Sequence, residues 1–308
     1  MSNIRSSSIR LFRFAGIDLF LHWSWFLVAA FEISGRGRTY SSPIWNALEY
    51  LALFVMVGLH EYGHALACRQ VGGIANQIVL WPLGGVAYVN PPPRPGATLW
   101  SIAAGPLVNV ALLPILSLVG MLNRSLGWAH AMPNAYALLR AVWFINLGLL
   151  IFNLLPIYPL DGGQILRSLL WFVVGRARSL LVVTVLGFAG VAGFLLLALW
   201  SHSIWLGVIA VFLLMNCWGG LQQARALSRV ANLPRHAAFV CPSCKASPPI
   251  GNFWKCGHCK AAFDTFETQT VCPNCAVRYS VTMCLDCRRS FPMSDWISPV
   301  LVAPNAKV

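Results

Sequence analysis

The residues best suited to bind a metal or transfer a proton form the sequence His60-Glu61-Tyr62-Gly63-His64. This is an H-E-x-x-H pattern inside an apolar run from about 47 to 68. On a helix, side chains four residues apart lie on one face, so both imidazoles can bind one zinc ion. Glu61 would lie beside that ion as a general base. The alternative is a pair of core histidines satisfied by hydrogen bonds. Ionisable residues at membrane depth are costly and mark functional sites, so we favour the metal site.

The composition of the chain indicates a multi-pass membrane protein. Hydrophobic residues make up 57% of its 308 residues and charged residues only 10%, whereas ordinary soluble domains are about 25% charged. The net charge of +13 is compatible with nucleic-acid binding. In a membrane protein it is explained more simply by arginines at the cytoplasmic ends of spans and by attraction to anionic lipid.

Apolar runs close to the roughly 20 residues that a spanning helix needs predict six transmembrane helices. They cover about 16–33, 47–68, 98–122, 136–155, 180–200 and 204–219, with a short helix at 165–172. The segment 72–95 is not helical in pattern, because Gly84 and Gly85 separate two apolar stretches and three prolines follow. There we predict a membrane-associated β-hairpin or re-entrant loop, whose two glycines are candidate substrate-binding residues.

Six spans would place both termini on the same side of the membrane. The arginines predicted on that side, before the C-terminal region is counted, are Arg5, Arg10, Arg13, Arg69, Arg94, Arg167, Arg176 and Arg178. The opposite loops carry Arg36, Arg38, Arg124 and Arg140. Because positive residues concentrate in cytoplasmic loops, we expect a multi-pass protein of a prokaryotic cell membrane with a cytoplasmic N-terminus and tail.

Two histidines do not complete a catalytic zinc site, which usually has three protein ligands and a water. Candidates for the third ligand in the membrane part are Asp161, His130, His202, Glu49 and Asp18. Asp161 is the best of them, since it follows a span that approaches the cytoplasmic side and lies where prolines and glycines break the helix. As a single residue it could equally be a turn aspartate, because Leu-Asp-Gly-Gly is typical turn sequence. Asn109, a polar residue at mid-membrane, is either an interhelical hydrogen-bonding residue or a substrate-binding one.

Eight of the ten cysteines form four C-x-x-C pairs after the last span. This spacing is typical of zinc knuckles in a reducing compartment rather than of secreted disulfides. Consecutive pairing predicts two four-cysteine zinc ribbons, and cross-braced pairing is the alternative. The predicted ligands are Cys241, Cys244, Cys256, Cys259, Cys272, Cys275, Cys284 and Cys287. Cys68 and Cys217 are interpreted as packing residues.

The predicted fold class is therefore an all-α polytopic membrane protein with about six transmembrane helices, a β-hairpin or re-entrant loop, and a small Cys-rich zinc-ribbon domain. The expected boundaries are 1–224 for the membrane domain, 225–240 for a linker, 241–290 for the double zinc ribbon and 291–308 for a flexible tail.

Four blocks in order resemble the site-2 protease family of intramembrane zinc metalloproteases. They are HEYGH, LWPLGGVA, AGPLVN and NLLPIYPLDGG, and the resemblance covers about residues 16–220. It implies that His60, His64 and Asp161 bind zinc and that Glu61 is the catalytic acid/base. It also implies regulated intramembrane proteolysis, in which peptide bonds within or next to transmembrane segments of other proteins are hydrolysed.

The implied cofactors are one catalytic and two structural Zn²⁺ ions, and the implied partners are transmembrane substrates and the lipid bilayer. The zinc-ribbon tail is a candidate site for a protein partner, while nucleic acid is not expected because no dense stripe of basic and aromatic residues is present. Neither a PDZ-like insert nor a CBS-like pair, both found in relatives, is evident. The alternatives are a catalytically silent relative that binds membrane proteins, and a zinc transporter or sensor.

Overall fold

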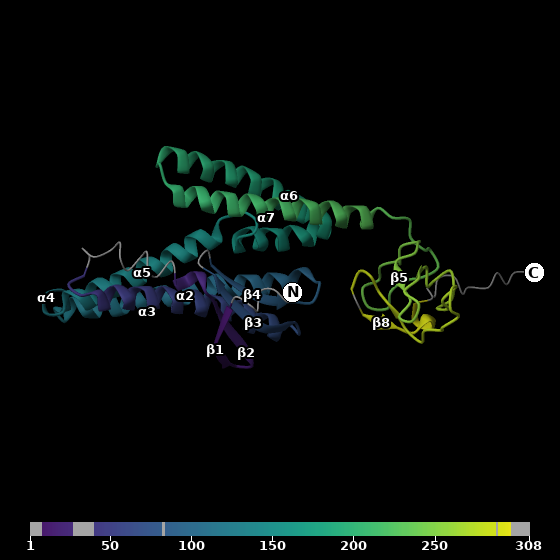
Figure 1. The fold of residues 1–308 in the computed structure, drawn as a ribbon, viewed down its shortest axis with the longest axis horizontal. Helices are drawn as coiled ribbons and strands as arrows, with labels where there is room; N and C mark the ends of the chain where they lie inside the picture. Colours follow the sequence, from purple (N-terminus) through teal and green to yellow (C-terminus); the bar gives the residue numbers. More distant parts are fainter. Residues whose placement is uncertain (1–7, 27–39, 82–83, 288, 297–308) are drawn as a thin grey trace, which may run out of the picture. The chain divides into compact units, whose positions relative to one another are not determined.

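The computed structural model describes residues 8–26, 40–81, 84–287 and 289–296. The chain divides into two compact units, Met1–Arg225 and Ala226–Val308. The first unit contains the long helices and one four-stranded sheet (Figure 1), and the second contains the four C-x-x-C motifs.

Five helices in the described residues are long and apolar enough to cross a membrane. They are α2 (Pro43–Gln70), α3 (Pro95–Ser125), α5 (Pro133–Leu154), α6 (Asp161–Trp200) and α7 (Ile204–Ala231), with the short α4 (Trp128–Ala131) between α3 and α5. These helices confirm the multi-pass class. The short helix predicted at 165–172 and the span at 180–200 are two parts of α6, interrupted at Gly175, whose φ of 82° is left-handed.

A four-stranded sheet packs beside α2. It contains β1 (Ser8–Phe14), β2 (Ile17–His22), β3 (Ile74–Trp81) and β4 (Gly84–Asn90), in the order β1-β2-β3-β4. The β3–β4 pair is antiparallel, which confirms the hairpin predicted for 72–95. The β2–β3 pair is parallel, because α2 forms the crossover between these two strands.

The helical span predicted at 16–33 is wrong for its first residues. Ile17–His22 form β2, and Ile17 and Leu19 face the core while Asp18 and Phe20 are more exposed. The physical reason is an alternation with period two, which a count of apolar residues ignores. The rest of the predicted span, from residue 27 onward, lies outside the described residues.

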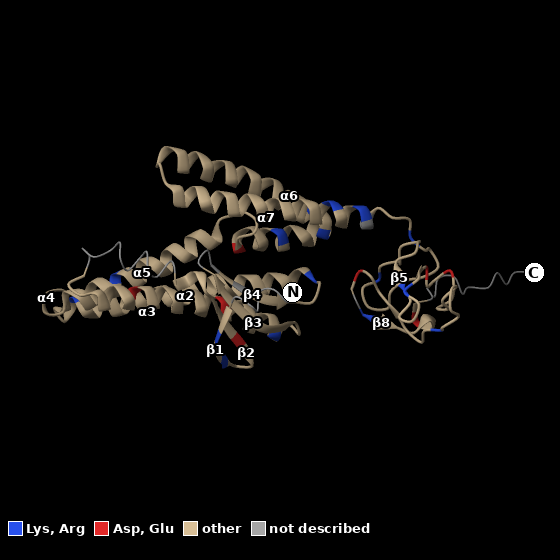
Figure 2. Ribbon diagram, in the orientation of Figure 1, with Lys and Arg blue, Asp and Glu red and all other residues tan. Residues whose placement is uncertain are grey.

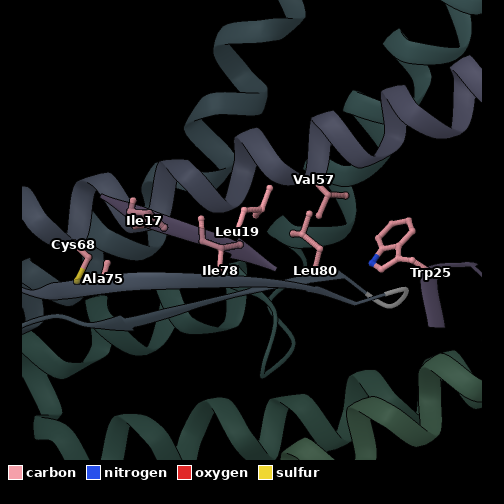
Figure 3. Close-up of a cluster of buried hydrophobic side chains, with 9 residues drawn as sticks. Ile17, Leu19, Trp25, Val57, Cys68, Ala75, Ile78 and Leu80 are labelled. Atoms are coloured by element: carbon pink, nitrogen blue, oxygen red, sulfur yellow. The ribbon is translucent and has the colours of Figure 1, made fainter. Parts of the chain in front are cut away.

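The core of the first unit lies between α2 and the sheet (Figure 3). Ile17, Ile78 and Leu80 from the strands are fully buried, and Val57 and Cys68 of α2 pack against the same cluster. At the end of α2, the guanidinium of Arg69 donates hydrogen bonds to the carbonyls of Gly16 at 2.9 Å and Ala75 at 2.7 Å. This residue therefore ties the β1–β2 turn and β3 to the helix that carries the histidines.

Helix α2 also packs on α3 and α5, and α3 contacts the first part of α6. The contact between α2 and α3 is close because Gly63 has no side chain. A Cβ atom at this position would lie 2.7 Å from the carbonyl oxygen of Ala104 on α3. Small residues of this kind let two membrane helices approach at backbone distance.

The second unit contains two short hairpins and a 3-10 turn around a shared aromatic core. The elements are β5 (Trp254–Lys255), β6 (Ala262–Phe263), β7 (Thr282–Met283), β8 (Ser290–Phe291) and η2 (Met293–Trp296). Trp296 is fully buried against Phe266, so the folded unit extends past the predicted boundary at 290. The predicted linker at 225–240 begins inside α7, and residues 297–308 lie outside the described part of the chain.

Candidate metal and catalytic centre

Helix α2 brings His60, Glu61 and His64 together next to the sheet. The three residues are 4%, 7% and 5% exposed, respectively. The two imidazoles lie one helical turn apart, with their Nε2 atoms separated by 3.1 Å. The H-E-x-x-H pattern therefore produces the common face expected for helical spacing of four.

Asp161 begins α6 and points into the same space. Its Oδ2 atom lies 3.0 Å from His60 Nε2 and 3.3 Å from His64 Nε2. Zinc bonds of about 2.0–2.2 Å in a tetrahedron separate the ligand atoms by about 3.3–3.5 Å. The three atoms form a nearly equilateral triangle of about that size, so these residues fit a zinc ion with a fourth position left for water.

The outer nitrogens of both histidines have acceptors. His64 Nδ1 donates to the carbonyl oxygen of Ser101 at 2.9 Å, and His60 Nδ1 donates to Asn109 Oδ1 at 2.6 Å. A backbone carbonyl only accepts hydrogen bonds, so His64 carries its proton on Nδ1 and presents an Nε2 lone pair to the site. Partners of this kind orient metal-binding histidines.

Glu61 lies beside the triangle and contacts the edge strand β4. Its Oε2 atom accepts a hydrogen bond from the Ala87 amide at 2.9 Å. A Cβ atom at Gly85 would lie 2.2 Å from Glu61 Cγ, so only glycine allows the strand to come this close. The carboxylate is thus fixed next to the candidate metal position, and one of its oxygens lies within 4.8 Å of a ring nitrogen of each histidine.

These residues open into a cavity of about 780 Å³. Its wall includes Gly85, Ala87 and Val89 of β4 on one side and Phe212 and Asn216 of α7 on another. The space is large enough for an extended stretch of several residues rather than for a water molecule alone. Its lining is mainly apolar, with a few amide side chains.

Comparison with known proteins identifies the family. The model of peptidase family M50 matches residues 49–132 and 115–197. A solved site-2 protease from Methanocaldococcus jannaschii is 30% identical, with a TM-score of 0.51, and the match covers 70% of this chain and 95% of that one. The chain belongs to peptidase family M50, the site-2 protease family.

Two curated relatives are also similar to this M50 chain. A zinc metalloprotease of Methanocaldococcus jannaschii is 34% identical over 71% of this chain and 61% of its own length. A candidate zinc metalloprotease of Synechocystis sp. is 28% identical over 76% of this chain and 65% of its own length. The chain thus spans somewhat less than two thirds of these relatives.

The other sequence candidates for the third ligand lie elsewhere in the M50 unit. Asp18 forms an ion pair with Arg10 at 2.6 Å, and Glu49 accepts a hydrogen bond from Tyr40 at 2.7 Å. His130 is in α4 and His202 lies between α6 and α7, and neither lines the cavity. Of the candidates, Asp161 is the one that the structure brings to the histidines.

The three candidate substrate-binding residues have different positions. Gly85 lines the cavity, and its role as a substrate contact stays a prediction. Gly84 is the first residue of β4 and pairs with Trp81. Asn109 is fully buried behind His60 and is not part of the cavity wall, so it contacts the candidate metal ligand instead of substrate.

Sequence reasoning missed Gly105, which makes room for the histidines. A Cβ atom there would lie 2.2 Å from His64 Nε2 and 2.8 Å from His60 Nε2. It also missed Ala87, which contributes only a backbone amide. The Ala-Gly-Pro block was a usable signal for Gly105, whereas a backbone donor leaves no signature in residue type.

In the second unit, eight cysteines form two clusters within which the sulfur atoms lie no more than 4.8 Å apart. One cluster is Cys241, Cys244, Cys284 and Cys287, and the other is Cys256, Cys259, Cys272 and Cys275. Sulfur contacts of 3.5–3.7 Å are close to the roughly 3.8 Å expected around tetrahedral zinc with bonds of about 2.3 Å. Both clusters therefore fit a structural zinc ion, and none of the cysteines forms a disulfide.

The pairing of the C-x-x-C motifs is nested, so the expectation of consecutive pairing is wrong. The first motif joins the fourth and the second joins the third. The physical reason is the common aromatic core, in which Trp254, Phe266 and Trp296 bring the two ends of the unit together. At the inner cluster, the Tyr279 hydroxyl donates to Cys256 Sγ at 3.0 Å and lowers the pKa of that thiol to about 5, which favours the thiolate.

Proposed function

We propose that this protein is an intramembrane zinc endopeptidase that cleaves peptide bonds within or next to transmembrane segments of other proteins. The single observation that carries the proposal is the triangle of His60, His64 and Asp161 with Glu61 beside it, inside a cavity among apolar helices. Membership of the M50 family and the names of its relatives support the same activity.

His60, His64 and Asp161 would hold the zinc ion. Bound there, zinc acidifies an attacking water and polarises the scissile carbonyl. Glu61 then removes a proton from the attacking water and delivers it to the leaving nitrogen. The Ala87 amide holds the carboxylate in place for this transfer, and the apolar cavity wall limits the access of bulk water.

The edge of β4 is the proposed binding place for the substrate. Among the described strands, β4 pairs only with β3, and its other edge faces the cavity. A transmembrane helix hides its peptide bonds in internal hydrogen bonds, so it must unwind before hydrolysis. An unwound segment can add to β4 as a further strand, which replaces the lost hydrogen bonds and lays the chain beside Glu61.

The distribution of charge supports a cytoplasmic location for the sheet. Basic residues gather where α6 begins and at the C-terminal end of α7 (Figure 2). Six predicted spans would place both termini on one side of the membrane. The described residues contain five candidate spans, so the number of spans no longer places the termini. Because β3 follows the C-terminal end of α2 and β2 runs parallel to it, the start of β2 lies at that end of the helix. Arg69 and Arg94 flank the same end in the sequence, and positive residues concentrate on the cytoplasmic side.

The transporter alternative is less well supported. Transit of zinc across the membrane needs a succession of ligands along a path. In the described part of the first unit, the sole cluster with metal-ligand character is the one around His60. The remaining polar residues of the cavity wall are Ser24 and the amides Asn153, Gln164 and Asn216.

A comparison of Glu61→Gln with wild type tests the proposal. Both proteins should hold three zinc ions per chain, but the variant should lose cleavage of a co-expressed transmembrane substrate. Glu49→Gln is a matched control, because it changes another buried glutamate of α2 that lies outside the cavity. Unchanged cleavage by Glu61→Gln would contradict the proposed mechanism.

A further inference from the structure

Two buried asparagines form a hydrogen-bonded unit behind His60, on the side away from the cavity. Asn109 on α3 and Asn146 on α5 are both fully buried. A buried amide must satisfy two donor hydrogens and an oxygen, because leaving them unpaired is costly. The hydrogen bonds between these two amides determine whether an amide oxygen or an NH₂ group faces His60.

The orientation of Asn146 follows from a main-chain atom. Its side-chain nitrogen lies 2.9 Å from the backbone carbonyl oxygen of Asn109. A carbonyl oxygen only accepts, so the Asn146 group that faces it must be the NH₂. The amide oxygen of Asn146 is consequently the atom that faces the Asn109 side chain.

The orientation of Asn109 follows in turn. Its side-chain group lies 2.8 Å from Asn146 Oδ1, which accepts a hydrogen bond, so this group must be the NH₂ of Asn109. The remaining Asn109 oxygen then lies 2.6 Å from His60 Nδ1. His60 must therefore carry its proton on Nδ1 and direct the Nε2 lone pair to the candidate metal position between Asp161 and His64.

We propose that Asn146 is a positioning residue for the metal centre, acting through Asn109 to hold His60 in the tautomer that binds zinc. The proposal rests on the proposed function, since it assigns a role within the same site. If Asn146 is lost, Asn109 can rotate its NH₂ towards His60, which then moves its proton to Nε2. Partners of metal-binding histidines typically alter metal affinity 10–100-fold.

The two histidines differ in how their tautomers are set. His64 donates directly to the backbone carbonyl of Ser101, which no substitution of a side chain removes. His60 depends on two side chains in sequence. Of the two histidines, His60 is therefore the one whose tautomer a side-chain substitution behind the ring should change.

The test measures zinc affinity of the membrane site by competition with a chelator in full-length protein. Asn146→Leu and Asn109→Leu should each raise the zinc Kd of this site about 10–100-fold. The double variant should be no worse than either single variant, because both changes break one relay. Cobalt in the same site should show an altered visible absorption spectrum in all three variants.

Asn123→Leu is the matched control, since it removes another buried amide of α3 that is outside the cavity. If the two asparagines serve stability alone, Asn146→Leu and Asn109→Leu should lower the melting temperature and leave zinc affinity and the cobalt spectrum unchanged. That result would overturn the proposal. Asn146→Ser adds no bulk and keeps the test possible if the leucine variant does not fold. If the variants lose zinc affinity while the wild-type protein binds zinc but shows no protease activity, the proposed function is refuted and the relay stands.

Discussion

The backbone amide of Ala87 donates a hydrogen bond to Glu61 Oε2 at 2.9 Å, so the edge strand of the sheet touches the candidate catalytic base. In a strand, alternate residues present their backbone groups to the same edge. The edge that holds Glu61 is therefore also the edge to which a substrate strand would add. Binding and proton transfer share one strand in this arrangement.

Replacing Gly85 with alanine should lower catalysis without removing zinc. The added Cβ would lie 2.2 Å from Glu61 Cγ and must push the carboxylate aside. A displacement of about 1 Å can cost about 100-fold in rate, so we expect a loss of that order in kcat. Zinc content should remain at three ions per chain. Gly120→Ala is the control, because the space around Gly120 is open, and wild-type cleavage by Gly85→Ala would contradict the expectation.

Replacing Gly105 with alanine, in contrast to Gly85→Ala, should remove the zinc ion of the membrane site. Its Cβ would lie 2.2 Å from His64 Nε2, within the space that the metal ligands need. Alanine favours helix over glycine by about 1 kcal/mol, so a loss of metal cannot be attributed to a weakened α3. Metal analysis should find two zinc ions per chain instead of three, both in the tail. Retention of all three ions together with full activity would show that the histidines lie elsewhere.

The nested pairing of cysteines can be tested by counting zinc in double variants. Cys241→Ser with Cys287→Ser should remove one ion, because both residues belong to one cluster. Cys241→Ser with Cys256→Ser should remove two ions, because it damages both clusters. Consecutive pairing predicts the reverse result for the two variants, so the pair of measurements decides between them.

The stability of the tail should depend on the charge of Asp264. Burial opposes ionisation of this carboxyl, but hydrogen bonds from the Gly251 amide and from His236 outweigh it and lower the pKa below its usual value near 3.8. A carboxyl whose pKa is lower in the folded state stabilises the folded protein at pH values above its usual pKa. This stabilisation is lost as the pH falls through the pKa of the folded state. Asp264→Asn should therefore destabilise the tail by about 1–3 kcal/mol at pH 7.

The difference between Asp264→Asn and wild type should begin to shrink as the pH falls below about 3.8 and should vanish only below the lowered pKa of the folded state, where the wild-type carboxyl is also neutral. Hydrogen exchange of peptides from the second unit measures this difference in the full-length protein. A gap that stays constant from pH 7 to a pH below the lowered pKa of Asp264 would show that its charge contributes nothing.

The sequence predicted most of the helices because their signal is local. Long apolar runs and the spacing of His60 and His64 are visible without any knowledge of the fold. The third ligand was harder, since Asp161 lies 101 residues after His60. Its selection depended on the broken helix around it and on family resemblance, because sequence separation carries no information about distance.

The failures of prediction share a cause, which is that tertiary pairing decided them. The strand at Ile17–His22 is apolar enough to be taken for part of a membrane helix, and its short alternating pattern becomes decisive only once its pairing with β1 and β3 is known. The cysteine motifs have equal spacing within each pair, so the sequence does not state which pairs meet. The buried Asn146 looks like any polar residue in a span until its bonds to Asn109 are known.

The parallel pairing of β2 with β3 has a consequence for the order of assembly during synthesis. The 28 residues of α2 lie between these strands, so β2 is made well before its central partner exists. The two histidines likewise emerge long before Asp161. A growing chain therefore holds an unfinished sheet until β4 is made and an incomplete ligand set until α6 begins to leave the ribosome, so the candidate metal centre is complete only after most of the membrane unit has been made.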